Sequence, residues 1–223
     1  MSHKKFYVKA GFLWLLHLPA AKQSSFAFGG KRYAYFRHRY NVTWLNERRV
    51  EIPVARAVLA EKAGAHVLEV GNVLPCYDTS LTHTVIDKYE SSARPGFFQA
   101  DAETFTDGAP YDLIISISTL EHVGWDETPR DEDKIGRTIR HLRGLLAPGG
   151  ELVFTAPVGY SPPLDRLVDE GEGFIDRRSL RRVNALNEWE EAEWSAVKGT
   201  AFHRPYPFAN ALVVARISAL SIG

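Results

Sequence analysis

The stretch Ala65-His66-Val67-Leu68-Glu69-Val70-Gly71 is a short apolar run that ends at a glycine. Ahead of it, apolar residues recur at helical spacing from Val50 to Ala63, and Gly64 is typical of the residue that ends a helix. A helix, a buried strand and a glycine turn in this order begin an α/β unit. We therefore expect a helix from about residue 46 to residue 63, followed by the first strand of a sheet.

The same alternation continues along the rest of the chain. Apolar residues from Ile135 to Leu146 mark a second helix, which the turn Pro148-Gly149-Gly150 ends. The run at 111–117 is nearly all apolar, as parallel strands buried on both faces are. These elements predict an open, doubly wound α/β sheet with helices on both faces. Further strands are expected at 84–86, 97–100, 151–156 and 211–217.

A β-hairpin is expected ahead of this sheet. Alternating aromatic runs at 26–28 and 33–36 flank Gly29-Gly30, a pair typical of a tight hairpin turn. The hairpin either packs its aromatic side chains on the main domain or faces a substrate as a cap. We assign residues 1–45 to an N-terminal cap, hairpin or dimer segment, and residues 46–223 to the main domain.

The composition excludes several classes of protein. Lys and Arg number 27 and Asp and Glu number 27 among 223 residues, and this zero formal charge disfavours binding through bulk phosphate attraction. Basic patches at 31–32, 177–178 and 181–182 leave nucleic acid open as a ligand, but no base-flipping motif accompanies them. A hydrophobic share of 45% excludes wholesale disorder. The one cysteine excludes an internal disulfide and a multi-cysteine metal site, and it favours a cytoplasmic protein.

The densest apolar run near the N-terminus extends from Phe12 to Leu16. His17 and Pro19 end it well before the ~20 apolar residues that a membrane span needs. The segment 18–21 resembles a signal-peptide cleavage site only faintly. We expect no membrane span here, and instead a buried segment, a lid or a dimer contact.

Acidic residues stand where three successive strands end. The first strand ends beside Glu69 and Gly71, the second ends at Asp87, and the third ends at Asp101. Ligands of open α/β sheets lie beyond these carboxyl ends, and Asp87 follows Gly71 by 16 positions, close to the ~20 expected for a carboxylate that binds a ribose diol. The loop from Gly71 to Leu74 has one glycine where a pyrophosphate loop needs three. It indicates either a nucleoside ligand without pyrophosphate or an ordinary strand–helix turn.

Six motifs occur in order along the chain: Val67–Gly71, Asp87, Asp101, Tyr111–Ser116, Leu120–Val123 and Leu145–Leu152. As a set they resemble the class I S-adenosylmethionine-dependent methyltransferases over roughly residues 46–160. The first motif departs from the usual glycine-rich pattern, because Asn72 and Leu74 stand where glycine is common. It is similar to a bacterial subgroup with Gly-Asn-Val-Leu and a later Asp-Lys-Tyr-Glu, here at 71–74 and 87–90, that is found among sugar- and polysaccharide-modifying enzymes.

The resemblance implies a Rossmann-like, doubly wound sheet of seven strands, mostly parallel with an antiparallel C-terminal strand. It also implies S-adenosylmethionine as the cofactor. Glu69 and the backbone of Gly71 would face the methionine end, with Asn72 and Val73 beside them. Ser118-Thr119, at the end of the fourth strand, would lie under the transferable methyl group.

The ribose and adenine ends follow from the same resemblance. Asp87, with Lys88 next to it, would accept hydrogen bonds from the ribose hydroxyls. Asp101 would bind the adenine amino group, with the backbone of Ala102 nearby. A rim rich in carboxylates suits the sulfonium cation of this cofactor. Arg48 or Arg49 would either reach the cofactor carboxylate or form a solvated start of the helix.

His122 is the candidate catalytic base. Transfer to an alcohol needs a base, and a histidine with an ordinary pKa of ~6.5 suits that role. Glu121 would orient His122 or bind a metal such as Mg²⁺ together with Asp126 and Glu127, although these acids equally suit a polar loop. In this family the histidine of Leu-Glu-His-Val often only lines the pocket, so that alternative stays open.

The molecule that accepts the methyl group must contact segments that lie outside the six motifs. Its wall is expected from the hairpin, the loop at 157–163 and the aromatic segment 189–208, since aromatic rings stack on sugar faces and arginines bind acids. The leading hypothesis is O-methylation of a small hydroxylated molecule, with a sugar or glycoside as the expected acceptor. The alternatives are N- or C-methylation of a natural product, and a nucleoside-binding protein without transferase activity; a homodimer stays open. The wall candidates are Trp125, Tyr160, Trp189, Trp194, His203 and Arg204.

Overall fold

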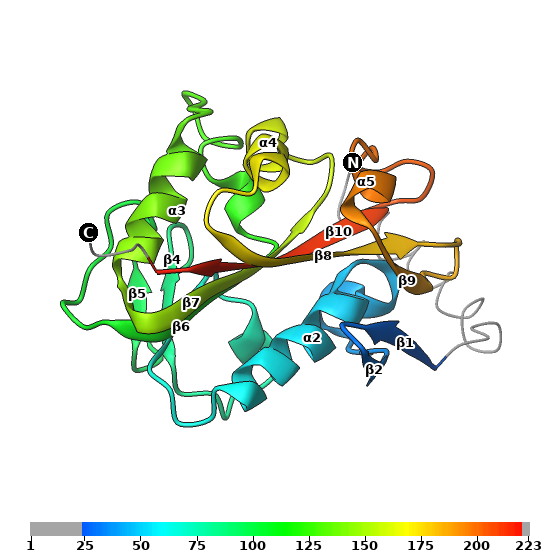
Figure 1. The fold of residues 1–223 in the computed structure, drawn as a ribbon. Helices are drawn as coiled ribbons and strands as arrows, with labels where there is room; N and C mark the ends of the chain where they lie inside the picture. Colours follow the sequence, from blue (N-terminus) through cyan, green and yellow to red (C-terminus); the bar gives the residue numbers. More distant parts are fainter. Residues whose placement is uncertain (1–23, 220–223) are drawn as a thin grey trace.

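A sheet of eight strands runs through the computed structural model, which describes residues 24–219 (Figure 1). The strand order is β5-β4-β3-β6-β7-β10-β8-β9. The first five strands of that order are parallel, whereas β10 is antiparallel to both of its neighbours and β9 is antiparallel to β8. The strands are β3 (Val67–Val70), β4 (Thr84–Asp87), β5 (Phe97–Gln99), β6 (Tyr111–Ile117), β7 (Leu146–Pro157), β8 (Phe174–Arg182), β9 (Trp189–Ala192) and β10 (Ala211–Ser218).

The expected Rossmann-like α/β fold with an antiparallel C-terminal strand is confirmed. The described sheet has eight strands instead of seven, because β9 adds an antiparallel edge strand beside β8. β7 also begins earlier than expected, at Leu146, and includes the Pro148-Gly149-Gly150 turn. The register of β6 and β7 shifts between Tyr111 and Leu113, so the turn is accommodated as an irregularity at the start of the strand.

Helices cover both faces of the sheet (Figure 1). Alternate residues explain why: Ile114 packs into the cluster under α3 and α4, whereas Leu113 and Ile115 pack with α2 on the other face. The described helices are α2 (Arg48–Glu61), α3 (Lys134–Gly144), α4 (Pro162–Glu170) and α5 (Trp194–Val197), and the 3-10 turns are η1 (Tyr40–Leu45), η2 (Leu74–Cys76) and η3 (Leu120–His122).

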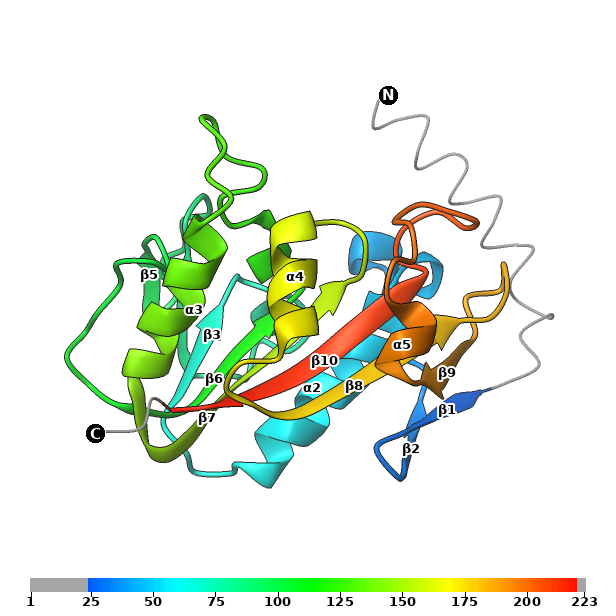
Figure 2. The ribbon, with the colours of Figure 1, turned by 45° about the horizontal axis from the view of Figure 1, so that its top comes forward.

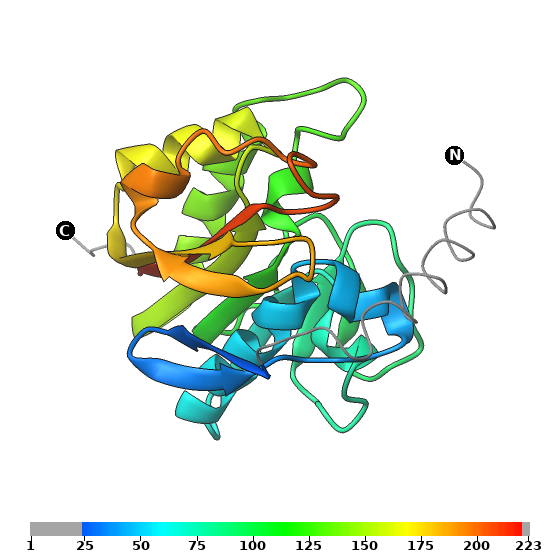
Figure 3. The ribbon, with the colours of Figure 1, turned by 90° about the vertical axis from the view of Figure 1, so that its right-hand side faces the viewer.

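The hairpin β1 (Ser25–Phe28) and β2 (Lys31–Ala34) forms as expected, with Gly29 and Gly30 at positive φ in its turn. It lies alongside α2 (Figure 3). Phe26 and Phe28 are buried against α2 and Trp189, so the aromatic side chains pack on the domain. Phe36 N, just after the hairpin, donates to Arg49 O at 3.0 Å, a carbonyl that Pro53 leaves without its helical partner.

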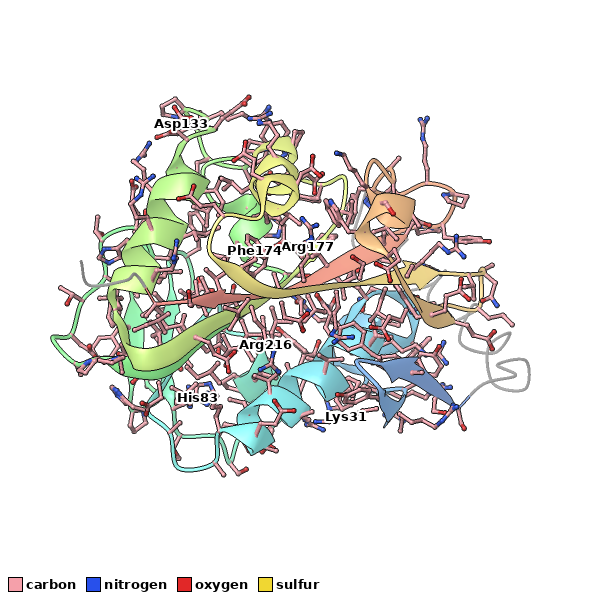
Figure 4. The ribbon with its side chains drawn as sticks, viewed as in Figure 1. Lys31, His83, Asp133, Phe174, Arg177 and Arg216 are labelled. Atoms are coloured by element: carbon pink, nitrogen blue, oxygen red, sulfur yellow. The ribbon has the colours of Figure 1, made fainter. Side chains whose placement is uncertain are left out.

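One residue of each basic patch is paired with an acid at the surface. Lys31 lies 2.7 Å from Glu61, which also accepts from Arg216 at 3.0 Å (Figure 4). Arg178 contacts Glu191 at 3.1 Å, and Arg181 pairs with Glu190 across β8 and β9. Among residues 24–219, no helix is long and apolar enough to cross a membrane. The apolar run at 12–16 lies outside the described residues.

Candidate active site

A cavity of about 360 Å³ opens at the carboxyl ends of the parallel strands. The strand order reverses between β3 and β6, which lie side by side (Figure 2). The segments that follow these two strands, with His122 of η3, supply part of the cavity wall. Of the residues expected from the sequence, those in the cavity wall are Gly71, Asp87, Lys88, Asp101, Ala102, Thr119 and His122. The expected residues that do not line it are Glu69, Asn72, Val73, Ser118 and Glu121.

The glycine at the end of β3 lies in close contact with the end of β6. Gly71 has a φ of +91°, and its N–H donates to Ile86 O at 2.8 Å. A Cβ at this position would lie 2.2 Å from Oγ1 of Thr119. The backbone therefore occupies space that any other residue would fill, and it leaves the cavity open beside β3.

Glu69 holds the loop after β3 instead of facing the cavity. Its side chain is fully buried, and Oε1 accepts hydrogen bonds from the N–H groups of Val73 at 2.9 Å and Leu74 at 2.7 Å. Its Oε2 lies 2.6 Å from Nε2 of His83, which Figure 4 labels. Both carboxylate oxygens are thus committed to protein partners, and the structure assigns Glu69 a positioning contact with the loop.

Asp87 is anchored by backbone N–H groups while it lines the cavity. Its Oδ1 accepts from Tyr89 N and Glu90 N, both at 2.8 Å, and its Oδ2 accepts from Asn72 N at 3.3 Å. The Asn72 side chain donates to Glu90 at 2.8 Å. A carboxylate oxygen has two lone pairs, so Oδ2 keeps a second acceptor position beside Asn72 N.

The cavity wall around Asp101 contains a closed ring of alternating charges. Oδ2 of Asp101 lies 2.6 Å from Nζ of Lys134 and 2.9 Å from Nζ of Lys88. Glu127 closes the ring, at 2.9 Å from Lys134 and 2.7 Å from Lys88. Burial favours the neutral acid, but hydrogen bonds from Lys134, Glu103 N and Lys88 outweigh it and lower the pKa of Asp101 to about 2. Asp101 is therefore ionised, and an adenine amino group would share it with two lysines.

A second polar cluster lies behind the end of β6. Glu51 is fully buried; its Oε1 accepts from Ser118 Oγ at 2.5 Å and Thr155 Oγ1 at 2.6 Å, and its Oε2 lies 2.6 Å from Arg48. Burial opposes the charge of Arg48, but Glu51 and Glu47 outweigh it and raise the pKa of Arg48. The interpretation of a solvated helix start is wrong, because these acids draw Arg48 inward.

The neighbouring Arg49 is also buried. It donates to Leu186 O at 2.6 Å and Asn187 O at 3.0 Å, and its guanidinium stacks 3.9 Å from the ring centre of Tyr35. Arg49 thus joins α2 to the loop before β9. Arg48 remains the guanidinium beside the end of β6, with Nη2 at 3.5 Å from Ser118 O.

His122 lines the cavity in a hydrogen-bonded chain. Its Nδ1 lies 2.6 Å from Oδ2 of Asp126, and the same oxygen accepts from the hydroxyl of Tyr160 at 2.6 Å. Burial of Asp126 works against its charge, but the bonds from Tyr160 and His122 outweigh it and lower its pKa. The adjacent Glu121 is only 2% exposed, and burial raises its pKa well above the usual value. Its Oε1 lies 3.7 Å from Nε2 of His122.

The expected metal ligands have other partners. Asp126 bonds to His122 and Tyr160, and Glu127 bonds to Lys88 and Lys134. Within residues 24–219, no group of three or more His, Cys, Asp or Glu side chains is placed to hold a metal ion. The structure therefore does not support Mg²⁺ in this site.

The aromatic side chains divide between the site and the core. Tyr160 contacts His122 and Phe202, with ring centres 4.9 Å apart in both pairs, and Phe202 leads on to His203 at 4.2 Å. Trp189 and Trp194 are buried in the two cores of the sheet, and they are wrong as wall candidates because their rings pack there. Trp125 lies under Arg130, whose guanidinium carbon is 3.7 Å from the centre of its ring.

Comparison with solved structures finds proteins that share the fold of this chain. The solved N-methyltransferase NodS from Bradyrhizobium japonicum WM9, in complex with S-adenosyl-L-homocysteine, is similar with a TM-score of 0.51 and 17% identity. The likeness covers 77% of this chain and 86% of that one. The chain has the class I methyltransferase fold.

Two curated relatives match parts of this methyltransferase fold. A trans-aconitate 2-methyltransferase from Streptomyces avermitilis is 40% identical over 77 residues, which are 34% of this chain and 25% of that protein. A malonyl-[acyl-carrier protein] O-methyltransferase from Paenibacillus sp. is 33% identical over 122 residues, which are 50% of this chain and 41% of that protein. The chain thus spans less than half the length of the relatives it matches. No family model matches it.

Sequence reasoning missed Lys134, Glu51 and Thr155 in the region around this methyltransferase fold's cavity. Lys134 stands at the start of α3 with an 8% exposed side chain, where a lysine is ordinarily solvated. The links from Glu51 to Thr155 and from Asp126 to Tyr160 join residues far apart in sequence, and only the packed sheet brings them together. The sugar-modifying subgroup stays a prediction.

Proposed function

We propose that the chain is an S-adenosylmethionine-dependent methyltransferase that transfers a methyl group to an oxygen of a small molecule. The observation that carries the proposal is His122 at the cavity wall, with Nδ1 bound to the ionised Asp126 at 2.6 Å. This arrangement keeps Nε2 available as a base, and it stabilises the imidazolium that forms when Nε2 takes up a proton. The names of the curated relatives, both methyltransferases, support it.

The cavity suits the proposed cofactor. Gly71 leaves room beside β3, Asp87 has an open acceptor position for the ribose, and Arg48 lies near the end of β6 for the methionine carboxylate. The cofactor supplies an electrophilic methyl group on a sulfonium, so the enzyme needs no covalent intermediate of its own. The chain's contribution is positioning, exclusion of water and removal of one proton.

His122 would act on the acceptor. The acceptor hydroxyl gives its proton to Nε2 of His122 as its oxygen takes up the methyl group, and Asp126 holds the ring through Nδ1. Tyr160 in turn fixes Asp126, and it forms an aromatic wall with Phe202. An aromatic wall beside a base suits a hydroxylated ring such as a sugar or glycoside.

A carboxylate acceptor is the second candidate. Aconitate and the malonyl group in the relatives' names both bear carboxylates. A carboxylate is already ionised at neutral pH, so its methylation needs no base. Replacement of His122 therefore separates the two: it would abolish transfer to a hydroxyl and leave transfer to a carboxylate largely intact.

Titration calorimetry with S-adenosylmethionine and S-adenosylhomocysteine tests the cofactor first. We expect micromolar binding, about −8 kcal/mol, that is lost in Asp87→Ala and kept in Asp176→Ala, a control on β8 outside the cavity. Methyl transfer to hydroxylated sugars and to dicarboxylates would then be compared for the wild type and His122→Ala. Failure of the wild type to bind either nucleoside would refute the proposal.

A further inference from the structure

The proposed base and the carboxylate that orients it are both half exposed. The side chains of His122 and Asp126 are 46% and 44% exposed, and Nδ1 of the ring lies 2.6 Å from Oδ2. An ion pair this exposed contributes little to stability, because water screens it and two side chains lose freedom. Tyr160 donates to the same oxygen at 2.6 Å, but this bond reaches only the tip of the Asp126 side chain. The backbone that carries Asp126 therefore needs to be held by other contacts.

The next residue, Glu127, supplies such contacts. Its side chain is only 17% exposed. Oε1 accepts from Gly124 N at 3.3 Å and from Nζ of Lys134 at 3.0 Å, and Oε2 lies 2.7 Å from Nζ of Lys88. Burial opposes the charge of Glu127, but the bonds from the two lysines outweigh it and lower its pKa. Glu127 is therefore ionised, and it ties its own loop to the segment after β4 and to α3.

The backbone between the base and Glu127 is a tight turn. Asp126 N donates to His122 O at 3.1 Å. Gly124 has a φ of +71°, and a Cβ there would collide with the carbonyl oxygen of Asp131. The turn is thus packed against the residues that lead into α3. A turn this compact passes a displacement at Glu127 on to Asp126, the residue beside it.

We propose that Glu127 is a positioning residue, which holds the loop so that Asp126 meets Nδ1 of His122. Without its charge, Lys88 and Lys134 no longer anchor the loop, and the distance from Asp126 to the ring is no longer fixed. The ring then adopts other orientations and carries its proton on either nitrogen, so Nε2 is available as a base for only part of the time. The inference rests on the proposed function, in which His122 is the base.

Nuclear magnetic resonance of the histidine rings tests the positioning without any methyl transfer. The ring nitrogens of His122, assigned by comparison with His122→Ala, are measured at pH 9, where an imidazole is ordinarily neutral. We expect the wild-type ring to carry its proton on Nδ1, next to Asp126. In Glu127→Gln part of the population should change to the Nε2–H form. Glu103→Gln is the matched control and should keep the wild-type form, because Glu103 also faces Lys134, at 4.0 Å, but lies outside the loop.

Kinetics with the hydroxylated sugars compared above give the second readout. Glu127→Gln should lower kcat about tenfold to a hundredfold, as expected for a displaced catalytic group, with a smaller change in KM. In the His122→Ala background the same replacement should have no further effect, because the group that it positions is gone. An equal loss of kcat in the presence and absence of His122 would overturn the inference.

The outcomes separate the inference from the proposed function. A wild-type ring that carries its proton on Nε2, or a proton position that Glu127→Gln leaves unchanged, overturns the positioning. If Glu127→Gln does not fold, Lys88→Gln takes its place and should change the ring in the same direction, since it frees Glu127 from one of its two lysines. The expected change in the ring, in a wild type that methylates no acceptor, leaves the link from Glu127 to His122 standing and refutes the proposed function alone.

Discussion

Replacement of Gly71 by alanine should destabilise the protein through two separable effects. The first is backbone strain, because Gly71 has a φ of +91°. A positive φ costs an L-residue about 1–2 kcal/mol. The second is steric, because the new Cβ would lie 2.2 Å from Oγ1, 2.8 Å from Cγ2 and 2.9 Å from Cβ of Thr119.

The steric effect can be sized from those distances. All three contacts are below 3.0 Å, so Thr119 or the loop must move. Overpacking of this kind costs about 1–3 kcal/mol. The total for Gly71→Ala is therefore about 2–5 kcal/mol, which lowers the melting temperature of a chain this size by roughly 5–15 °C.

Two further variants divide the total into its parts. Gly64 has a φ of +82° and no heavy atom within 4 Å of an added Cβ, so Gly64→Ala should show the strain alone, about 1–2 kcal/mol. Adding Thr119→Ala to Gly71→Ala removes the two shortest contacts, and it should return about 1–2 kcal/mol relative to the sum of the single variants. Urea unfolding followed by circular dichroism gives each free energy of unfolding. Equal losses in Gly71→Ala and Gly64→Ala, with no coupling to Thr119, would refute the close contact.

Two other predictions concern buried charges. Lys134→Met should lower the free energy of unfolding, measured in urea, by about 2–3 kcal/mol, because Asp101 and Glu127 lose their most buried partner while Lys88 remains. An unchanged urea midpoint would contradict the ring of charges. Burial raises the pKa of Asp165 to about 6, whereas its value in the unfolded chain is near 4. Between these two pH values the folded state keeps a proton that the unfolded state releases. The free energy of unfolding therefore falls as the pH rises from about 4 to 6. Asp165→Asn keeps an oxygen that accepts from Gly159 N, so it should stabilise the protein by about 1–2 kcal/mol at pH 7 and not at pH 4. A gain in stability that does not vary with pH would count against burial as the cause of the raised pKa.

The parallel half of the sheet was predictable because its strands are buried on both faces. The strand 111–117 is almost entirely apolar, and the structure places β6 over those residues. The strands β8 and β9 were missed for the opposite reason. β8 reads Phe-Ile-Asp-Arg-Arg-Ser-Leu-Arg-Arg, and two of its arginines pair with Glu190 and Glu191 on β9, a pairing that no local pattern reveals.

The site residues that could be predicted from the sequence are those that lie at the ends of the parallel strands. Gly71, Asp87 and Asp101 come to one cavity because parallel strands end at the same edge. What a side chain does there depends on partners distant in sequence. Glu69 turned inward to the loop after β3, and Arg48 turned inward to Glu51. Neither outcome could be read from residue type, since both depend on how the loops fold over the sheet.

The loop at 123–133 joins the two ends of the cavity through consecutive side chains. Asp126 bonds to His122 and Tyr160, whereas Glu127 bonds to Lys88 and Lys134. The loop is closed by Asp131 N, which donates to Gly124 O at 2.9 Å. Because adjacent residues are fixed to two different walls, a shift that frees Glu127 also displaces the carboxylate that orients His122. The charged ring around Asp101 and the proposed base thus depend on the same short piece of backbone.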